Sequence, residues 1–258
     1  MIIYESENEY GKGEVRSWAS LIDEATIEQA NRMARSPIIE GYLALMPDAH
    51  FGYGPPVGSA LKTRGGVAPY CVGSDIGCGM IAVQLNVKRH ELAGREGHIL
   101  GHIRDLVPSG VGQARKEHAP EVAAFIHDNG LPEGIWNERL ELRNREDLAR
   151  LTVPMQFGTL GAGNHFAEVS EDENGQVWLI VHSGSRNIGN TLATAHWKHA
   201  KHVCDDLDIT VEHNELAYFP DSITDAKDYL GDMLWCQKYA FAQREAMMNR
   251  LIEAVNME

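Results

Sequence analysis

The chain has 258 residues, of which 43% are hydrophobic and 23% charged, a composition typical of an ordered globular protein with a real core. Its formal net charge of −14 argues against non-specific nucleic-acid binding through a generally basic surface, but not against a local basic groove. No apolar run is long enough to cross a bilayer, and the acidic N-terminus does not resemble a signal peptide. Four scattered cysteines do not indicate a disulfide scaffold, so we expect a cytoplasmic protein with reduced thiols.

Hydrophobic periodicity predicts a helix early in the chain and strands after it. The helix covers Asp23–Arg35 and is ended by Pro37. The stretch from Tyr42 to Gln84 is rich in Gly and Pro and indicates short strands joined by tight turns, among them Val57–Leu61 and Met80–Leu85.

The middle of the chain, Glu91–Leu151, has a helical pattern that a loop at Pro108–Glu117 interrupts, and Glu133–Arg150 forms a charged amphipathic segment within it. A second Gly-rich strand region follows, with Val177–Val181 as its clearest strand.

The remainder, from Asn190 onward, is mostly helical and includes a long amphipathic helix over Tyr229–Val255. We therefore predict an α+β fold. A single domain, residues 1–258, has two β-rich segments that bracket a helical insertion, followed by a helical C-terminal part.

The segment Gly73–Gly79 contains a carboxylate and a thiol three residues apart, Asp75 and Cys78. Both are metal-ligand types, and the glycines allow the loop to turn both inward. The alternative is that Cys78 is simply a small buried residue.

A Gly-rich turn, Gly158–Gly163, precedes Asn164, His165 and Glu168. Glycines in such a turn let backbone N–H groups approach an anion closely. The segment matches neither the P-loop nor the dinucleotide-binding pattern. Its histidine is either a ligand or a satisfied polar residue of the turn.

At the end of the apolar Val177–Val181 strand lies His182, followed by Ser183, Ser185 and Arg186. Hydroxyls, backbone amides and a guanidinium in this position are able to hold a phosphate group. A polar turn after a strand is the alternative.

Asp48 and His50 lie in the segment Met46–Gly54 and are two ionisable groups on one turn. They are suited either to acid–base chemistry or to capping the turn.

His196, His199 and His202 recur every third residue, which imitates a metal-binding strip. That spacing drifts around a helix, so we expect a solvated helix face instead.

Taken together, four segments resemble the RtcB family of RNA ligases, in the same order and at similar spacing from the N-terminus to the end of the sequence. They are Met46–Gly54, Gly73–Gly79, Gly158–Glu168 and His182–Gly189. The resemblance implies one manganese ion bound by Asp75, Cys78 and His165. A second ion would be bound in part by His182, with Cys78 as the bridging ligand.

The resemblance also assigns roles to four other residues. Asn164 matches a residue near the guanylate phosphate, and Glu168 matches one on the nucleotide side. Arg186 matches an arginine that holds RNA phosphate, and Asp48 a carboxylate proposed as the base during strand joining.

The activity implied by the resemblance is GTP- and manganese-dependent joining of RNA ends. A 3′-phosphate or 2′,3′-cyclic phosphate end is joined to a 5′-hydroxyl end through a guanylylated histidine. Two cations suit this chemistry, because they neutralise charge that develops in phosphoryl transfer. Asp, Cys and His ligands favour Zn²⁺ over Mn²⁺ by affinity, so the residue types and the family's metal disagree.

Family members are usually longer, and their further segment carries another metal-binding histidine and the guanylylated histidine. Neither has a counterpart in this sequence. We therefore expect an incomplete second metal site, no ligation by the chain alone, and a second chain or self-association that covers exposed apolar surface.

Two other functions fit the same residues. A metal-dependent phosphoesterase would open cyclic phosphates without GTP. A non-catalytic protein that binds RNA ends or a partner would keep that binding after Cys78→Ala.

Overall fold

The computed structural model describes residues 1–257 and confirms a mixture of helices and sheets, as the α+β prediction requires. The contacts divide the chain into two compact units. Unit 1 consists of Met1–Ser74, Asn137–Glu141 and Ala193–Gly231, and unit 2 of Asp75–Trp136, Leu142–Leu192 and the residues from Asp232 on. The expectation that residues 1–258 fold as one domain stays a prediction.

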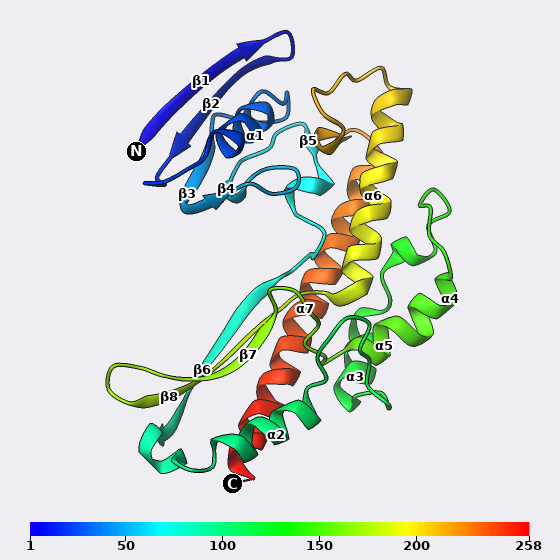
Figure 1. The fold of residues 1–258 in the computed structure, drawn as a ribbon. Coiled ribbons are helices and arrows are strands. Elements are labelled where there is room, and N and C mark those ends of the chain that lie inside the picture. Colours follow the sequence, from blue (N-terminus) through cyan, green and yellow to red (C-terminus); the bar gives the residue numbers. More distant parts are fainter. Residues whose placement is uncertain (258) are drawn as a thin grey trace. The chain divides into compact units, whose positions relative to one another are not determined.

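Unit 1 contains a four-stranded sheet in the order β1-β2-β3-β4 (Figure 1). The β2–β3 pair is parallel and the other two pairs are antiparallel. The strands are β1 (Ile2–Asn8), β2 (Gly11–Ser17), β3 (Leu43–His50) and β4 (Val57–Ala60). The sequence does not predict the β1–β2 hairpin, because most of its residues are polar or glycine and β1 buries none of its side chains.

One face of this sheet is covered by α1 (Glu24–Ala34), which confirms the predicted helix. The Asp23 carboxylate caps its first turn by accepting a hydrogen bond from the Thr26 backbone N–H at 2.8 Å. Met33 of α1 is fully buried in the same cluster as Val15 and Leu43 of the sheet. Helical spacing therefore directs the apolar side of α1 onto the strands.

Unit 1 also contains a two-stranded ladder of β5 (Gly66–Val67) and β9 (Phe219–Pro220) and two short helical turns, η1 (Pro69–Cys71) and η5 (Asn214–Leu216). The long helices α6 (Arg186–Asp206) and α7 (Thr224–Asn256) have residues in both units.

The prediction of a solvated histidine face on α6 is wrong. His196 is 1% exposed, and its ring contacts those of Phe219 and Tyr229. His199 Nε2 lies 2.5 Å from Asp225 Oδ1, and of the three only His202 is exposed. Aromatic residues of β9 and α7 bury this face, which periodicity within α6 alone does not reveal.

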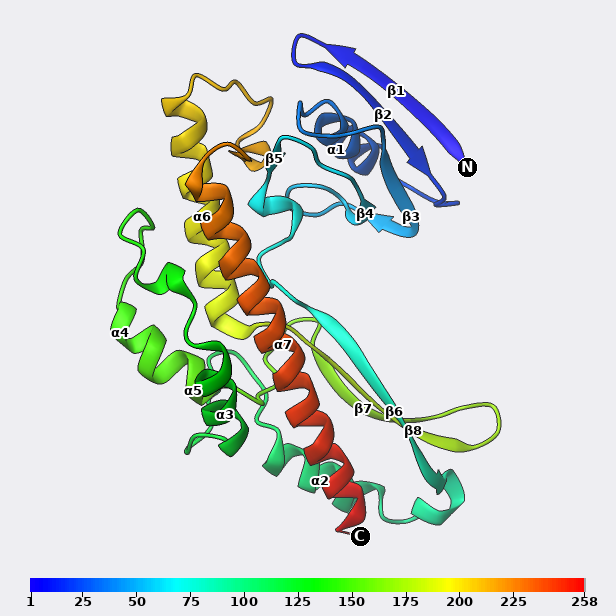
Figure 2. The same ribbon diagram turned by 180° about the vertical axis from the view of Figure 1, so that it is seen from behind.

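Unit 2 contains an antiparallel sheet in the order β6-β8-β7, and α7 runs beside it (Figure 2). The strands are β6 (Gly79–Lys88), β7 (Phe166–Glu171) and β8 (Gln176–Ser183), so the predicted strands in β6 and β8 are confirmed. Val177, Leu179 and Val181 of β8 share a core with Met247 and Leu251 of α7. The helix predicted over Tyr229–Val255 is confirmed within α7.

Between β6 and β7 lie helices α2 (Glu96–Leu106) and α3 (Pro120–Asn129), which flank the predicted loop at Pro108–Glu117. Several shorter pieces complete this region: η2 (Arg89–Leu92), η3 (Glu133–Ile135), α4 (Arg145–Asp147), η4 (Leu148–Thr152) and α5 (Val153–Gln156).

The helical pattern over Glu133–Arg150 does not give one helix. Asn144 takes a left-handed backbone conformation with a φ of 52°, which a continuous right-handed helix cannot include.

Within the described part of the chain, no helix is both long enough and apolar enough to cross a bilayer.

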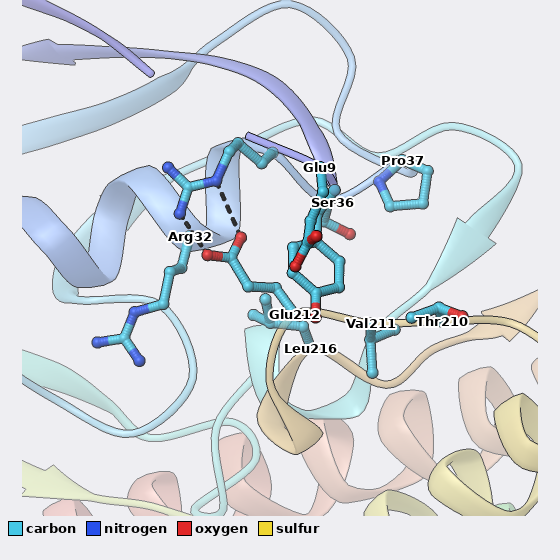
Figure 3. A pocket seen from close by; sticks show the side chains of 10 residues that line it. Glu9, Arg32, Ser36, Pro37, Thr210, Val211, Glu212 and Leu216 are labelled. Atoms are coloured by element: carbon cyan, nitrogen blue, oxygen red, sulfur yellow. Dashed lines mark hydrogen bonds and ion pairs between the residues drawn. The ribbon is translucent and has the colours of Figure 1, made fainter. Parts of the chain in front are cut away.

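A largely buried ion pair joins the end of α1 to the loop before η5 within unit 1 (Figure 3). Arg35 donates from Nε to Glu212 Oε2 at 2.9 Å and from Nη2 to Oε1 at 2.5 Å. The two side chains are 8% and 14% exposed and line a cavity of about 530 Å³. The hydrogen bond from Arg35 lowers the pKa of the Glu212 carboxyl.

We expect Arg35→Met to lower the free energy of unfolding by about 3 kcal/mol, because it leaves a buried carboxylate without its partner. Urea unfolding measures this. The pKa of Glu212 is lower in the folded state than the ordinary glutamate pKa of 4.5. The ion pair therefore stabilises the fold fully above pH 4.5, and this stabilisation is lost as the pH falls through the pKa of the folded state. Glu212→Gln should therefore lose stability at neutral pH and show less of the acid-dependent loss than wild type.

Candidate metal centre

The candidate site lies at one end of the β6-β8-β7 sheet in unit 2. Gly79, at the start of β6, pairs with Ser183 at the end of β8, and Phe166, at the start of β7, pairs with His182. Because both neighbours run antiparallel to β8, the loops that enter β6 and β7 meet beside the end of β8. This register brings the residues before β6 and β7 to His182.

Four predicted ligands converge there. Cys78 Sγ lies 3.2 Å from His182 Nε2 and 3.6 Å from His165 Nε2. His165 Nε2 also lies 2.8 Å from Asp75 Oδ2. The potential ligand atoms of Asp75, Cys78 and His165 are all within 4.8 Å of one another. Cys78 is thus the residue in contact with both histidines.

Backbone carbonyls fix the orientation of both imidazoles. His165 Nδ1 lies 3.1 Å from the Leu160 carbonyl oxygen, and His182 Nδ1 lies 3.0 Å from that of Asn164. A carbonyl oxygen only accepts, so each Nδ1 must carry the proton and donate it. In a neutral imidazole this leaves the Nε2 lone pair of each ring available to a metal ion, as in metal-binding histidines.

Glycines make room for the charged groups. A Cβ built on Gly184 would collide with the Asp75 carboxylate, and one built on Gly161 would meet the Arg186 guanidinium and His165. Gly161 also has a φ of 94°, which favours glycine on conformational grounds. The carboxylate and the guanidinium therefore occupy space that larger residues would fill.

The chemistry of Cys78 favours a cation. Partial burial and, to a smaller extent, the nearby Asp75 carboxylate together raise the pKa of its thiol to about 11, although Arg244 opposes the shift. At neutral pH and without a cation the thiol keeps its proton. A metal ion binds the thiolate and would displace that proton.

Arg186 is the first residue of α6 and has a φ of 61°. Its Nε donates to Thr159 Oγ1 at 3.2 Å, and burial lowers the pKa of its guanidinium. Glu168 is exposed on β7 and, by alternation from the Phe166–His182 pair, faces the same side of the sheet as His182. Asn164 contributes the carbonyl that orients His182.

Asp48 is exposed on β3 and belongs to unit 1, so its predicted role as a base stays a prediction.

Sequence reasoning misses two residues of α7 that contact this site. Arg244 Nη1 donates to the Gly77 carbonyl at 2.6 Å and to the Ser183 carbonyl at 2.8 Å. Gln243 Nε2 donates to Ser183 Oγ at 3.3 Å. Both residues belong to a long helix without any local motif, so no signal in the sequence marks them.

The site is a candidate transition-metal centre, because it combines a carboxylate, a thiol and two imidazoles. The partly buried guanidinium of Arg186 beside them is suited to binding phosphate. Comparison with known proteins agrees with the motifs. The model of a family described as "tRNA-splicing ligase RtcB" matches residues 29–258. The chain belongs to the RtcB family, as the resemblance of its motifs predicted.

Several curated relatives are named as RNA ligases. The RNA-splicing ligase RtcB of Escherichia coli K12 is 33% identical over 237 residues, which cover 88% of this chain and 57% of that protein. The tRNA-splicing ligase RtcB of Nanoarchaeum equitans is 28% identical over 92% of this chain and 59% of its own length. The chain thus spans a little over half the length of these relatives.

Gly184→Ala tests whether the glycine that follows β8 leaves the space that the Asp75 carboxylate occupies. The new methyl group would displace the Asp75 carboxylate, and we expect affinity for Co²⁺ to fall by about tenfold or more. Titration by absorbance measures this. Gly101→Ala is the matched control, because its Cβ would meet no neighbouring atom. Equal affinities for both variants would contradict the assignment.

Metal binding should release the Cys78 proton at neutral or mildly alkaline pH, because the thiol pKa is about 11 without a cation. Calorimetry in buffers of different ionisation enthalpy measures the proton count. We expect wild type to release about one proton more per metal than Cys78→Ala. The same count for both proteins would mean that Cys78 is not a thiolate ligand.

Proposed function

We propose that this chain contributes the metal- and phosphate-binding part of an RNA ligase. The ligase joins an RNA end with a 3′-phosphate or 2′,3′-cyclic phosphate to an end with a 5′-hydroxyl. The observation that carries the proposal is the contact of Cys78 Sγ with both His165 and His182, next to Asp75. Such a thiolate is placed to bridge two cations.

In this proposal Asp75, Cys78 and His165 hold one metal ion, and Cys78 and His182 hold part of a second coordination sphere. The distances and the orientation of both imidazoles support this assignment. Metal ions bound there would neutralise the charge that develops during phosphoryl transfer.

The other residues act on the substrates. Arg186 holds an RNA phosphate, which its position beside His165 at Gly161 supports. Asn164 and Glu168 face the guanine nucleotide, and Asp48 accepts the proton of the attacking 5′-hydroxyl. GTP would transfer GMP to a histidine with release of pyrophosphate. The GMP would then move to the RNA 3′-phosphate and leave when the 5′-hydroxyl attacks. A second chain or self-association would cover exposed apolar surface.

We propose manganese as the metal of the reaction, on the basis of the family. The ligand types themselves favour Zn²⁺, so Mn²⁺ would bind where it is the more available ion. A cytoplasmic location suits the site, because Cys78 binds metal only when it is reduced.

The test compares two RNA oligonucleotides that differ only in carrying a 3′-phosphate or a 3′-hydroxyl. With Mn²⁺ present, we expect the chain to bind the phosphorylated end at least about tenfold more tightly, because that end adds charge-assisted contacts. Cys78→Ala should abolish this preference and sharply lower the amount of bound metal. Equal affinity of wild type for both ends would contradict the proposed function.

Three readouts separate the competing activities. The mass of the intact chain after incubation with GTP and Mn²⁺ detects a covalent GMP adduct, which would locate the nucleophilic histidine within these 258 residues. Opening of a cyclic phosphate without GTP would favour a phosphoesterase. RNA binding that survives Cys78→Ala unchanged would favour a non-catalytic protein.

A further inference from the structure

Arg244 lies where the two ligand-bearing segments come together. It projects from α7, is 8% exposed, and donates from one guanidinium nitrogen to two backbone carbonyls. One carbonyl belongs to Gly77, next to Cys78 in the sequence, and the other to Ser183, next to His182. The Arg244 side chain therefore links the residue before Cys78 to the residue after His182.

These carbonyls lie where the β6–β8 ladder ends. The last pair of the ladder is Gly79 with Ser183. The Gly77 carbonyl precedes β6, so ladder hydrogen bonds do not fix its distance from β8. The Arg244 guanidinium supplies a link at this point, and its planar fork has little freedom once its donors are engaged.

The position of Arg244 is itself fixed by α7. Its neighbour Gln243 is fully buried and donates to Ser183 Oγ and to the Gly184 carbonyl. One turn further along α7, Met247 and Met248 are buried in the core beneath β8. A rigid helix thus holds the guanidinium against both segments.

We propose that Arg244 is a positioning residue that sets the separation of Cys78 and His182 so that one metal centre can include both. The proposal rests on the proposed role of these two residues as metal ligands. Arg244 would not bind metal. It acts through His182, by holding the end of β8 against the loop that carries Cys78.

A thermodynamic cycle tests the action through His182. We expect Arg244→Met to weaken Co²⁺ binding by about 10- to 100-fold, the range for residues that orient metal ligands. We expect the same substitution to have little further effect in a His182→Ala background, because the ligand that Arg244 positions is already absent. The readouts are the Co²⁺ affinity and the thiolate-to-cobalt absorption band.

Arg250→Met is the matched control. Arg250 lies on the same helix, is 7% exposed, and pairs with Glu121 at 3.1 Å. We expect this variant to lose thermal stability while its Co²⁺ affinity stays close to that of wild type. If Arg244→Met and Arg250→Met bind Co²⁺ equally, or if Arg244→Met is just as harmful without His182, the positioning role is wrong.

Arg244→Lys covers the case in which the methionine variant does not fold. Lysine keeps the charge but presents a single ammonium on a flexible stem, so we expect binding between that of wild type and His182→Ala. Wild-type affinity in Arg244→Lys would overturn the proposal. Failure of the wild-type chain to bind Co²⁺ would instead refute the proposed metal centre itself, which keeps the two results distinct.

Discussion

The candidate site depends on the antiparallel register of β6, β8 and β7. Cys78 enters the sheet just before β6 and His165 just before β7, while His182 is next to the last residue of β8. The central position of β8 allows the two incoming loops to meet on either side of its end. A shift of one residue in this register would turn His182 to the opposite face of the sheet.

A fixed register also requires a well-packed face. Val177, Leu179 and Val181 alternate along β8 and pack with α7, which leaves Ile180 and His182 on the other face. The apolar core thus determines the side of the sheet on which the candidate ligand His182 lies. The same helix provides Gln243 and Arg244 at the end of the sheet, so packing and positioning come from one element.

The charges around Asp75 and Cys78 explain why a bound cation would stabilise this site. The Asp75 carboxylate lies 2.8 Å from an imidazole nitrogen, and its charge helps to keep the Cys78 thiol protonated. The guanidiniums of Arg186 and Arg244 counter part of this charge, but burial disfavours their own charged forms. A divalent ion would stabilise the carboxylate and the thiolate together.

The sequence by itself determined the family, the α+β class, the principal helices and strands, and the identities of Asp75, Cys78, His165 and His182 as candidate ligands. The fold class and the elements follow from hydrophobic periodicity and glycine-rich turns, whereas the family and the ligand roles of His165 and His182 follow from the resemblance of the motifs to a known family. Helix α1 illustrates this, since Asp23, Met33 and Pro37 mark its start, its buried side and its approximate end.

Tertiary structure alone decided how those residues meet and which others support them. Cys78 and His182 are 104 positions apart, and only the β6–β8 register brings them into contact. Arg244 and the buried His196 have no local signal, because their surroundings come from strands and helices distant in the sequence. Local patterns encode which way a side chain faces, but the partner on that side depends on contacts formed only when the chain folds.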